Sequence, residues 1–117
     1  MKILGVISFL VLFLITSNYG FAADIVQADI NGQEYLFDKD TIILEDIVVK
    51  PDNLIIDGLV EVENHGVIKT DISLLDGTTL FFRNTGVVNA KFDLGVSSVL
   101  YHKITTNNEI KYVDFNV

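Results

Sequence analysis

Short apolar runs separated by turn-forming residues fill the chain after its first 22 residues. Apolar and polar positions alternate with a period of two in Leu59–Glu63 and again in Ala90–Leu94. β-branched and other aliphatic residues form further short runs at 42–44 and 47–49. Gly, Asn and Asp interrupt these runs every few residues, and helical periodicity is almost absent. This pattern predicts an all-β domain built from many short strands.

A weak internal repeat relates these strands to one another. Residues 60–68 (Val-Glu-Val-Glu-Asn-His-Gly-Val-Ile) align with residues 80–88 (Leu-Phe-Phe-Arg-Asn-Thr-Gly-Val-Val) at an offset of 20. A degraded third copy places residues 46–48 over 66–68. A period of about 20 residues predicts a β-solenoid, in which each turn of the chain stacks on the previous one.

The offset of 20 residues also places side chains of matching character in columns. Glu63 falls over Arg83 and Asp71 over Lys91, which predicts neighbours of opposite charge if turns stack about 4.8 Å apart. Asn64 and Asn84 coincide, which predicts amides bonded along the stack. Three apolar columns have the same spacing: Val60, Leu80 and Leu100; Ile72, Phe92 and Tyr112; Leu54, Leu74 and Leu94.

Three dipeptides favour a different all-β fold. Asn31-Gly32, Asp57-Gly58 and Asp76-Gly77 are flanked by strand-like runs, and such pairs are typical of two-residue hairpins. A series of hairpins would give an antiparallel, immunoglobulin-like β-sandwich. The corners of a solenoid use Gly and Asn for the same backbone reason, so these dipeptides do not separate the two folds. We favour the solenoid because of the repeat.

The chain divides into three predicted segments. Residues 1–22 have the order of a secretory signal peptide: Lys2, an apolar run over residues 3–15, and small residues at Gly20 and Ala22 before the expected cut. The apolar run is shorter than the roughly 20 residues that a membrane-spanning helix needs. We therefore expect export to the periplasm, cell surface or medium, with no membrane span after cleavage. Residues 23–40 lie outside the repeat and predict an N-terminal cap with a hairpin, and residues 41–117 predict the solenoid repeats.

Composition limits the partners of the exported part. The chain has no cysteine, so its stability does not come from disulfides. Without the leader, seven basic residues face 16 acidic ones, a net charge of −9. Such a domain repels phosphate groups, which argues against nucleic acid and anionic lipid surfaces.

Candidate chemical groups are few, and each has a simpler structural interpretation. His65 near Glu61 and Glu63 falls short of the three or more converging ligands with second-shell support that a metal site needs. An acidic stretch lacks the ordered spacing of a calcium loop: Asp38, Asp40, Glu45 and Asp46. Four carboxylates are candidates for paired catalytic acids of a glycoside-processing enzyme: Glu61, Glu63, Asp71 and Asp93. Four aromatic residues are candidates for a binding stripe: Tyr35, Phe81, Tyr101 and Tyr112. The sequence assigns no catalytic residue, no cofactor and no metal ligand.

Residues 58–68 and 79–88 resemble the rungs of bacterial β-helix adhesins and autotransporter passengers, which repeat short strands ending in an Asn-x-Gly corner. The resemblance implies an exported or surface-exposed binding element, and it carries over no functional residue. Some likeness to polymer-forming bactofilin-type solenoids also exists, although those lack an export signal.

We therefore expect a non-enzymatic structural or adhesive domain that binds protein or carbohydrate at the cell surface, or associates with itself through the solenoid ends. The alternatives are a sandwich-type binding module and, third, a small carbohydrate-active enzyme.

Overall fold

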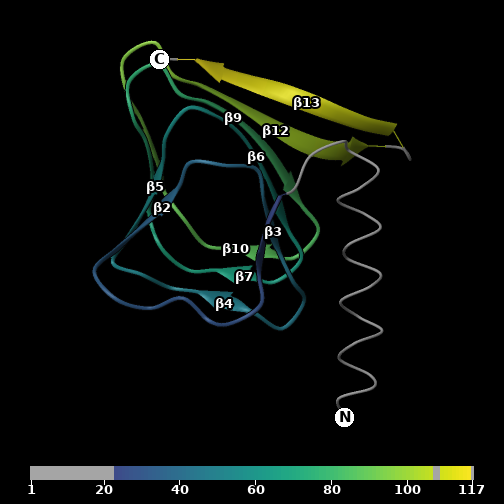
Figure 1. Ribbon diagram of the computed structural model, residues 1–117. Helices are drawn as coiled ribbons and strands as arrows, with labels where there is room; N and C mark the ends of the chain where they lie inside the picture. Colours follow the sequence, from purple (N-terminus) through teal and green to yellow (C-terminus); the bar gives the residue numbers. More distant parts are fainter. Residues whose placement is uncertain (1–22, 107–108, 117) are drawn as a thin grey trace.

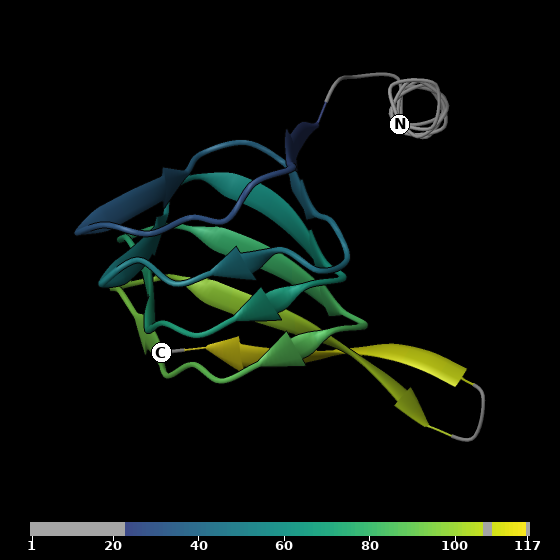
Figure 2. The same cartoon turned by 90° about the horizontal axis from the view of Figure 1, so that it is seen from below.

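The chain after the predicted leader is a β-solenoid of about four turns (Figures 1 and 2). The structure, a computed structural model, describes residues 23–106 and 109–116, with side chains described as far as residue 103. The predicted signal peptide lies outside these residues. No helix in the described part is long and apolar enough to cross a membrane.

Each turn contributes short strands to three sides of the coil. The first turn contains β1 (Asp24–Val26) and β2 (Glu34–Phe37), with Ile30 bridging to the next turn between them. The second contains β3 (Thr41–Ile43), β4 (Val48–Val49) and β5 (Asn53–Ile56). The third contains β6 (Leu59–Asn64), β7 (Val67–Ile68) and β8 (Ile72–Leu74). The fourth contains β9 (Thr79–Asn84), β10 (Val87–Val88) and β11 (Phe92–Leu94), and β12 (Val99–Thr106) and β13 (Glu109–Asn116) follow.

Three sheets form the sides of the coil, which Figure 1 shows nearly end-on. Sheet A has the order β1-β3-β6-β9-β12-β13, sheet B the order β10-β7-β4, and sheet C the order β11-β8-β5-β2. Every named pair is parallel except β12 with β13. The parallel pairing confirms the solenoid and excludes the antiparallel sandwich.

The register confirms the offset of 20 residues where the repeat is clearest. β6 pairs with β9 through Val60 and Leu80 and through Glu63 and Arg83, and β12 continues the column with Leu100. The second turn is out of step with this spacing, because Val48 pairs with Val67 and Leu54 with Ile72.

Two predicted apolar columns are therefore wrong in part. Leu54 stands over Ile72 instead of Leu74, since the second turn is shorter on that side of the coil. Tyr112 does not follow Phe92, because the chain reverses after β12 and Tyr112 pairs with Lys103. Figure 2 shows this β12–β13 hairpin extending past the other strands.

The prediction of a local hairpin within residues 23–40 is also wrong. β1 pairs in parallel with β3 in sheet A, and β2 pairs in parallel with β5 in sheet C. Ile30 bridges to Val49 between them. These residues form the first turn of the solenoid, with a sequence too divergent to align with the later turns.

The interior of the coil is a single apolar core. Alternation in β6 and β9 turns every second side chain inward, and Val60, Leu80 and Phe82 are each 1% exposed. Burying one such side chain contributes roughly 1.5–3 kcal/mol. The three Asx-Gly glycines all have positive φ (Gly32 113°, Gly58 101°, Gly77 76°), which only glycine adopts readily, and they form corners instead of hairpins.

The Asn-x-Gly corner explains the most regular part of the repeat. The amide of Asn64, fully buried, donates from Nδ2 to Oδ1 of Asn84 at 2.7 Å and accepts from the Gly66 N–H at 3.1 Å. This confirms the predicted asparagine column. A Cβ on Gly86 would lie 2.1 Å from the Gly66 carbonyl oxygen, so the corner has no room for a side chain there.

Replacing Asn64 with Ala is expected to cost about 1–3 kcal/mol of unfolding free energy, because the buried Gly66 N–H loses its acceptor. Urea denaturation followed by circular dichroism measures the loss. Asn89→Ala, at an exposed position, is the control and should change stability by less than about 0.5 kcal/mol. Equal effects of the two substitutions would contradict a structural role for the Asn64 amide.

A disulfide tests the register directly. Cysteines at Glu63 and Arg83, which are partners in β6 and β9, should crosslink under mild oxidation. Stacked strands bring such Cα atoms within the range of about 4.4–6.8 Å that a disulfide tolerates. A second variant with cysteines at Ile56 and Leu59 joins the two positions that a hairpin at Asp57-Gly58 would pair. Closure of that variant alone, scored by mass spectrometry, would contradict the solenoid.

Candidate functional site

The outer face of sheet A carries the densest group of interacting polar side chains that the structure describes. This Glu63 cluster consists of Glu61, Glu63, His65, Arg83 and Thr85. Alternation in β6 directs Glu61 and Glu63 outward, while Arg83 comes from β9 in the next turn. His65 and Thr85 occupy the equivalent middle position of the two Asn-x-Gly corners.

Both carboxylate oxygens of Glu63 are engaged within this cluster. Its Oε1 lies 3.2 Å from Arg83 Nη1, and its Oε2 lies 2.5 Å from His65 Nε2. His65 Nδ1 in turn lies 2.7 Å from the hydroxyl of Thr85. The predicted Glu63–Arg83 pair is thus confirmed. The contacts connect the third and fourth turns, so their effect is to hold the turns in register.

The environment of Glu61 is less favourable for a charged carboxylate. Partial burial raises its pKa above 4.5, and the negative charges of Asp40 and Glu63 add to this, while Arg83, with Nη1 3.8 Å from Glu61 Oε2, lowers it. Asp40 itself is fixed, because its Oδ1 accepts the Glu61 backbone N–H at 2.9 Å. Glu61 is therefore protonated more easily than an ordinary glutamate side chain.

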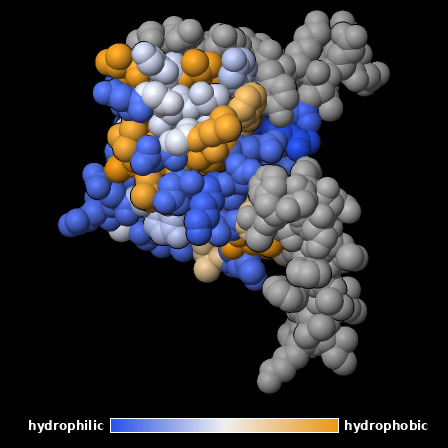
Figure 3. All heavy atoms as spheres, turned by 45° about the horizontal axis from the view of Figure 1, so that its top comes forward, coloured by the Kyte–Doolittle hydropathy of each residue, from blue (hydrophilic) through white to orange (hydrophobic). Residues whose placement is uncertain are grey.

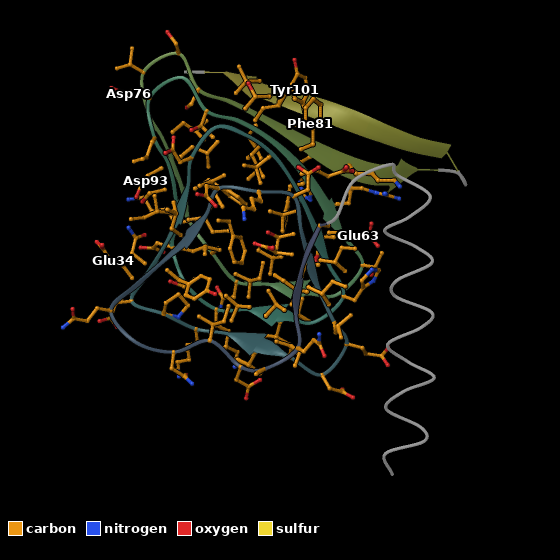
Figure 4. The ribbon with its side chains drawn as sticks, viewed as in Figure 1. Glu34, Glu63, Asp76, Phe81, Asp93 and Tyr101 are labelled. Carbon is orange, nitrogen blue, oxygen red and sulfur yellow. The ribbon has the colours of Figure 1, made fainter. Side chains whose placement is uncertain are left out.

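The four carboxylates considered for glycoside chemistry do not come together. Glu61 and Glu63 belong to sheet A, whereas Asp93 belongs to β11 of sheet C, and Asp71 lies just before β8 of that sheet. Figure 4 shows Glu63 and Asp93 on opposite sides of the coil.

Asp71 and Lys91 are neighbours across the turns, as predicted, but no salt bridge is described between their side chains. Asp71 Oδ1 accepts the backbone N–H of Lys91 at 3.4 Å. The Lys91 ammonium instead lies 3.7 Å from Asp93 within its own turn.

Among the described residues, no group of three or more His, Cys, Asp or Glu is arranged to hold a metal ion. In the acidic stretch, Asp40 binds the backbone of the third turn, and Asp46 forms a corner with φ of 69°. These two residues therefore have local structural roles.

Of the predicted stripe of four aromatic residues, the described side chains bring one pair together. Phe81 and Tyr101 stack on neighbouring strands of sheet A, with ring centroids 4.8 Å apart and planes 9° apart (Figure 4). Tyr35 lies in β2 of sheet C and packs edge-on against Phe37. Tyr112 lies in β13, beyond the described side chains. Stacking covers one face of each ring, so these two faces are not available to stack on a sugar.

The first end of the coil is a feature that the sequence did not indicate. A hollow of about 490 Å³ opens there, lined mainly by the first turn. Its lining combines backbone and side chains of β1, the Ile30 segment and β2, including Ile25, Tyr35 and Leu36. The apolar residues Ile30 and Phe37 could have indicated that this segment forms a turn of the coil, but the sequence was interpreted as a hairpin.

The other end exposes the same interior columns. Ile68, Ile72 and Leu74 in the third turn are at most 2% exposed. Their counterparts in the fourth turn, Val88 and Phe92 among them, are only partly buried although they pack against the core. No further strand follows β10 or β11 in sheets B and C of the described structure. In the described part of the chain, core side chains such as Val88 and Phe92 are therefore partly exposed at the last end, whereas Ile30 and Phe37 stay buried at the first.

Charge is distributed unevenly between the ends. Residues 23–76 carry 13 acidic and three basic side chains, whereas residues 77–117 carry three acidic and four basic ones. The first turns are thus strongly acidic, and the last ones are almost neutral. Figure 3 shows hydrophilic and hydrophobic residues interspersed over the described part of one face, without one large apolar area.

Comparison of the chain with protein families, with curated proteins and with solved structures finds no match. The likeness to adhesin and autotransporter rungs therefore extends to the fold, a β-solenoid, and to nothing finer.

Replacing Glu61 with Gln is expected to stabilise the protein slightly at pH 7. The raised pKa means that the folded state holds the Glu61 proton more tightly than the unfolded state. Its contribution is therefore favourable at low pH and is lost as the pH rises through the folded pKa. The gain at pH 7 should stay below about 1 kcal/mol, since the side chain is 39% exposed, and should vanish near pH 4.

Urea unfolding at the two pH values measures this difference. Glu34→Gln, on an exposed position of β2, controls for the change in net charge. A larger destabilisation by Glu61→Gln at pH 7 than at pH 4 would mean instead that the contact with Arg83 dominates.

Proposed function

We propose that this chain is an exported, non-enzymatic β-solenoid element with a structural or adhesive role in the periplasm, at the cell surface or outside the cell. The observation that carries the proposal is the last end of the described coil, where the interior column through Ile68 ends at the partly exposed Val88. Solenoids need covered ends to stay soluble, and open strand edges pair with other chains. The ends are therefore the proposed binding surfaces.

Export is supported by the sequence. The first 22 residues have the order of a signal peptide: a basic residue, an apolar run too short to span a membrane, and two small residues before Ala23. Because the chain has no cysteine, disulfides cannot stabilise the exported form, and packing of the solenoid core must do so.

A binding role is favoured over catalysis by the state of the polar side chains. The carboxylate of Glu63 is used by Arg83 and His65, and Asp40 is used by the Glu61 backbone. Glu61 lies beside Glu63 and next to Arg83 on sheet A, and Asp71 and Asp93 stand on another side of the coil. A paired acid and nucleophile needs two free carboxylates about 5–9.5 Å apart in one cleft.

A protein partner is favoured over a carbohydrate. Stacking covers one face of each of the Phe81 and Tyr101 rings, whereas strand edges at the ends offer backbone hydrogen bonds to another strand. A second copy is the simplest such partner. Two acidic N-terminal ends repel each other, so the contact favoured by charge joins the acidic end of one copy to the near-neutral end of the next.

A matched pair of substitutions on β10 tests this contact. Val88 belongs to the interior column at the open end, whereas its neighbour Val87 points outward and is 55% exposed. Val88→Lys should weaken self-association by about tenfold or more, because a charge enters the surface to be covered. Val87→Lys should leave the association unchanged.

Sedimentation velocity over a range of concentrations measures the association, and circular dichroism verifies that both variants remain folded. A chain that stays monomeric throughout, or equal weakening by the two substitutions, would contradict self-association through the ends.

A further inference from the structure

We infer that Asn31 is a site of spontaneous covalent modification, at which its side-chain amide closes on the nitrogen of Gly32 to form a succinimide that then opens to aspartate and isoaspartate. The inference does not depend on the proposed function. It rests on the geometry of the corner between the Ile30 segment and β2.

The corner leaves both reacting groups accessible. Asn31 and Gly32 are exposed, and no hydrogen bond in the described part of the chain holds the Asn31 amide. Gly32 has φ of 113°, and the position that a Cβ would occupy has no atom within 4 Å. Glycine therefore has no side chain to shield its nitrogen, and the space that such a side chain would fill is open.

Other asparagines in the same fold are protected by identifiable contacts. The Asn64 amide is fully buried and bonded to Asn84, whose Nδ2 donates to the Gly86 carbonyl. The Oδ1 of Asn53 accepts from the hydroxyl of Ser73. Each bond holds the amide away from the backbone nitrogen of the following residue.

Asn89 is the closest comparison, because it is also exposed but precedes Ala90. The methyl group of Ala90 crowds the nitrogen that would have to attack, and the residue lies next to β10, with its own N–H bonded to the Ile68 carbonyl. Asn31 and Asn89 are thus both exposed, but only Asn31 is followed by glycine, whose nitrogen no side chain shields.

The reaction needs only water. The Gly32 nitrogen loses its proton and bonds to Cγ of Asn31, the Cγ–Nδ2 bond breaks, and ammonia leaves with that proton. Water then adds to one of the two carbonyl groups of the succinimide. Opening at one carbonyl restores the original backbone with an aspartate side chain, and opening at the other routes the backbone through the former side chain as isoaspartate.

Either product alters the first turn. Both add a negative charge to the acidic half of the coil. Isoaspartate also lengthens the backbone by one methylene between the Ile30 bridge and β2. On either side of that point, the Lys50 N–H donates to the Ile30 carbonyl at 2.7 Å, and the Asp52 N–H donates to the Gly32 carbonyl at 2.8 Å. These two bonds cannot both keep their register, so the first turn loosens from the second.

The test is to incubate the purified chain in mildly alkaline buffer and follow each asparagine by peptide mass spectrometry. Replacement of the amide by a carboxyl group gives a small mass gain, and enzymatic methylation of isoaspartate identifies the second product. The expected result is about tenfold or more product at Asn31 than at Asn89. Methyl incorporation should disappear in the Asn31→Gln variant, whose longer side chain closes its ring poorly.

A urea-denatured sample of the same chain completes the experiment. Modification of Asn31 in denatured chain but not in folded chain would overturn the inference, because the corner would then hold the glycine nitrogen out of reach. Equal modification of Asn31 and Asn89 in the folded chain would overturn it as well, since the local geometry would have no role.

Discussion

Parallel pairing between consecutive turns is the interaction on which the rest of this structure depends. Each turn is too short to bury its own apolar side chains, and it becomes stable only when the next turn covers them. The pairing fixes which side chains meet: Val60 meets Leu80, Glu63 meets Arg83, and Asn64 meets Asn84. Core columns, ion pairs and the asparagine ladder are all consequences of one backbone register.

The same dependence explains why the ends differ from the middle. A turn in the middle has neighbours on both sides, so Ile68 and Ile72 are excluded from solvent. The first and last turns have one neighbour each, which leaves a hollow beside β1 and β2 and partly exposed side chains at β10 and β11. At the last end, β13 pairs antiparallel with β12 and changes the direction of sheet A, while sheets B and C simply stop. On the flat sides, polar side chains mostly interact with one another; Glu63, for example, contacts His65 in its own turn and Arg83 in the next. A binding role for the ends follows from this contrast between satisfied sides and uncovered ends.

Corners have a second role in this fold besides turning the chain. Where a corner is packed between two turns, as at Gly86, it excludes any side chain and holds the preceding asparagine in a hydrogen-bonded ladder. At the first turn, no described atom lies within 4 Å of the position that a Cβ of Gly32 would occupy, and Asn31 is exposed. Position within the stack thus decides whether an Asn-Gly or Asn-x-Gly sequence is structurally fixed or chemically accessible.

The sequence alone determined the fold class, the spacing of the third and fourth turns, the Glu63–Arg83 pair and the asparagine column. It could do so because strand alternation and the repeat in residues 60–88 are local patterns, which can be recognised from the types of side chain alone. Tertiary structure alone decided that residues 23–40 form a full turn, that Leu54 stands over Ile72 and that Lys91 turns to Asp93. Those features depend on corner length and on the neighbouring turn, so a two-residue difference in a corner moves Leu54 to a new partner. The reversal at β13 and the hollow at the first end are likewise properties of where stacking stops, which no short stretch of sequence encodes.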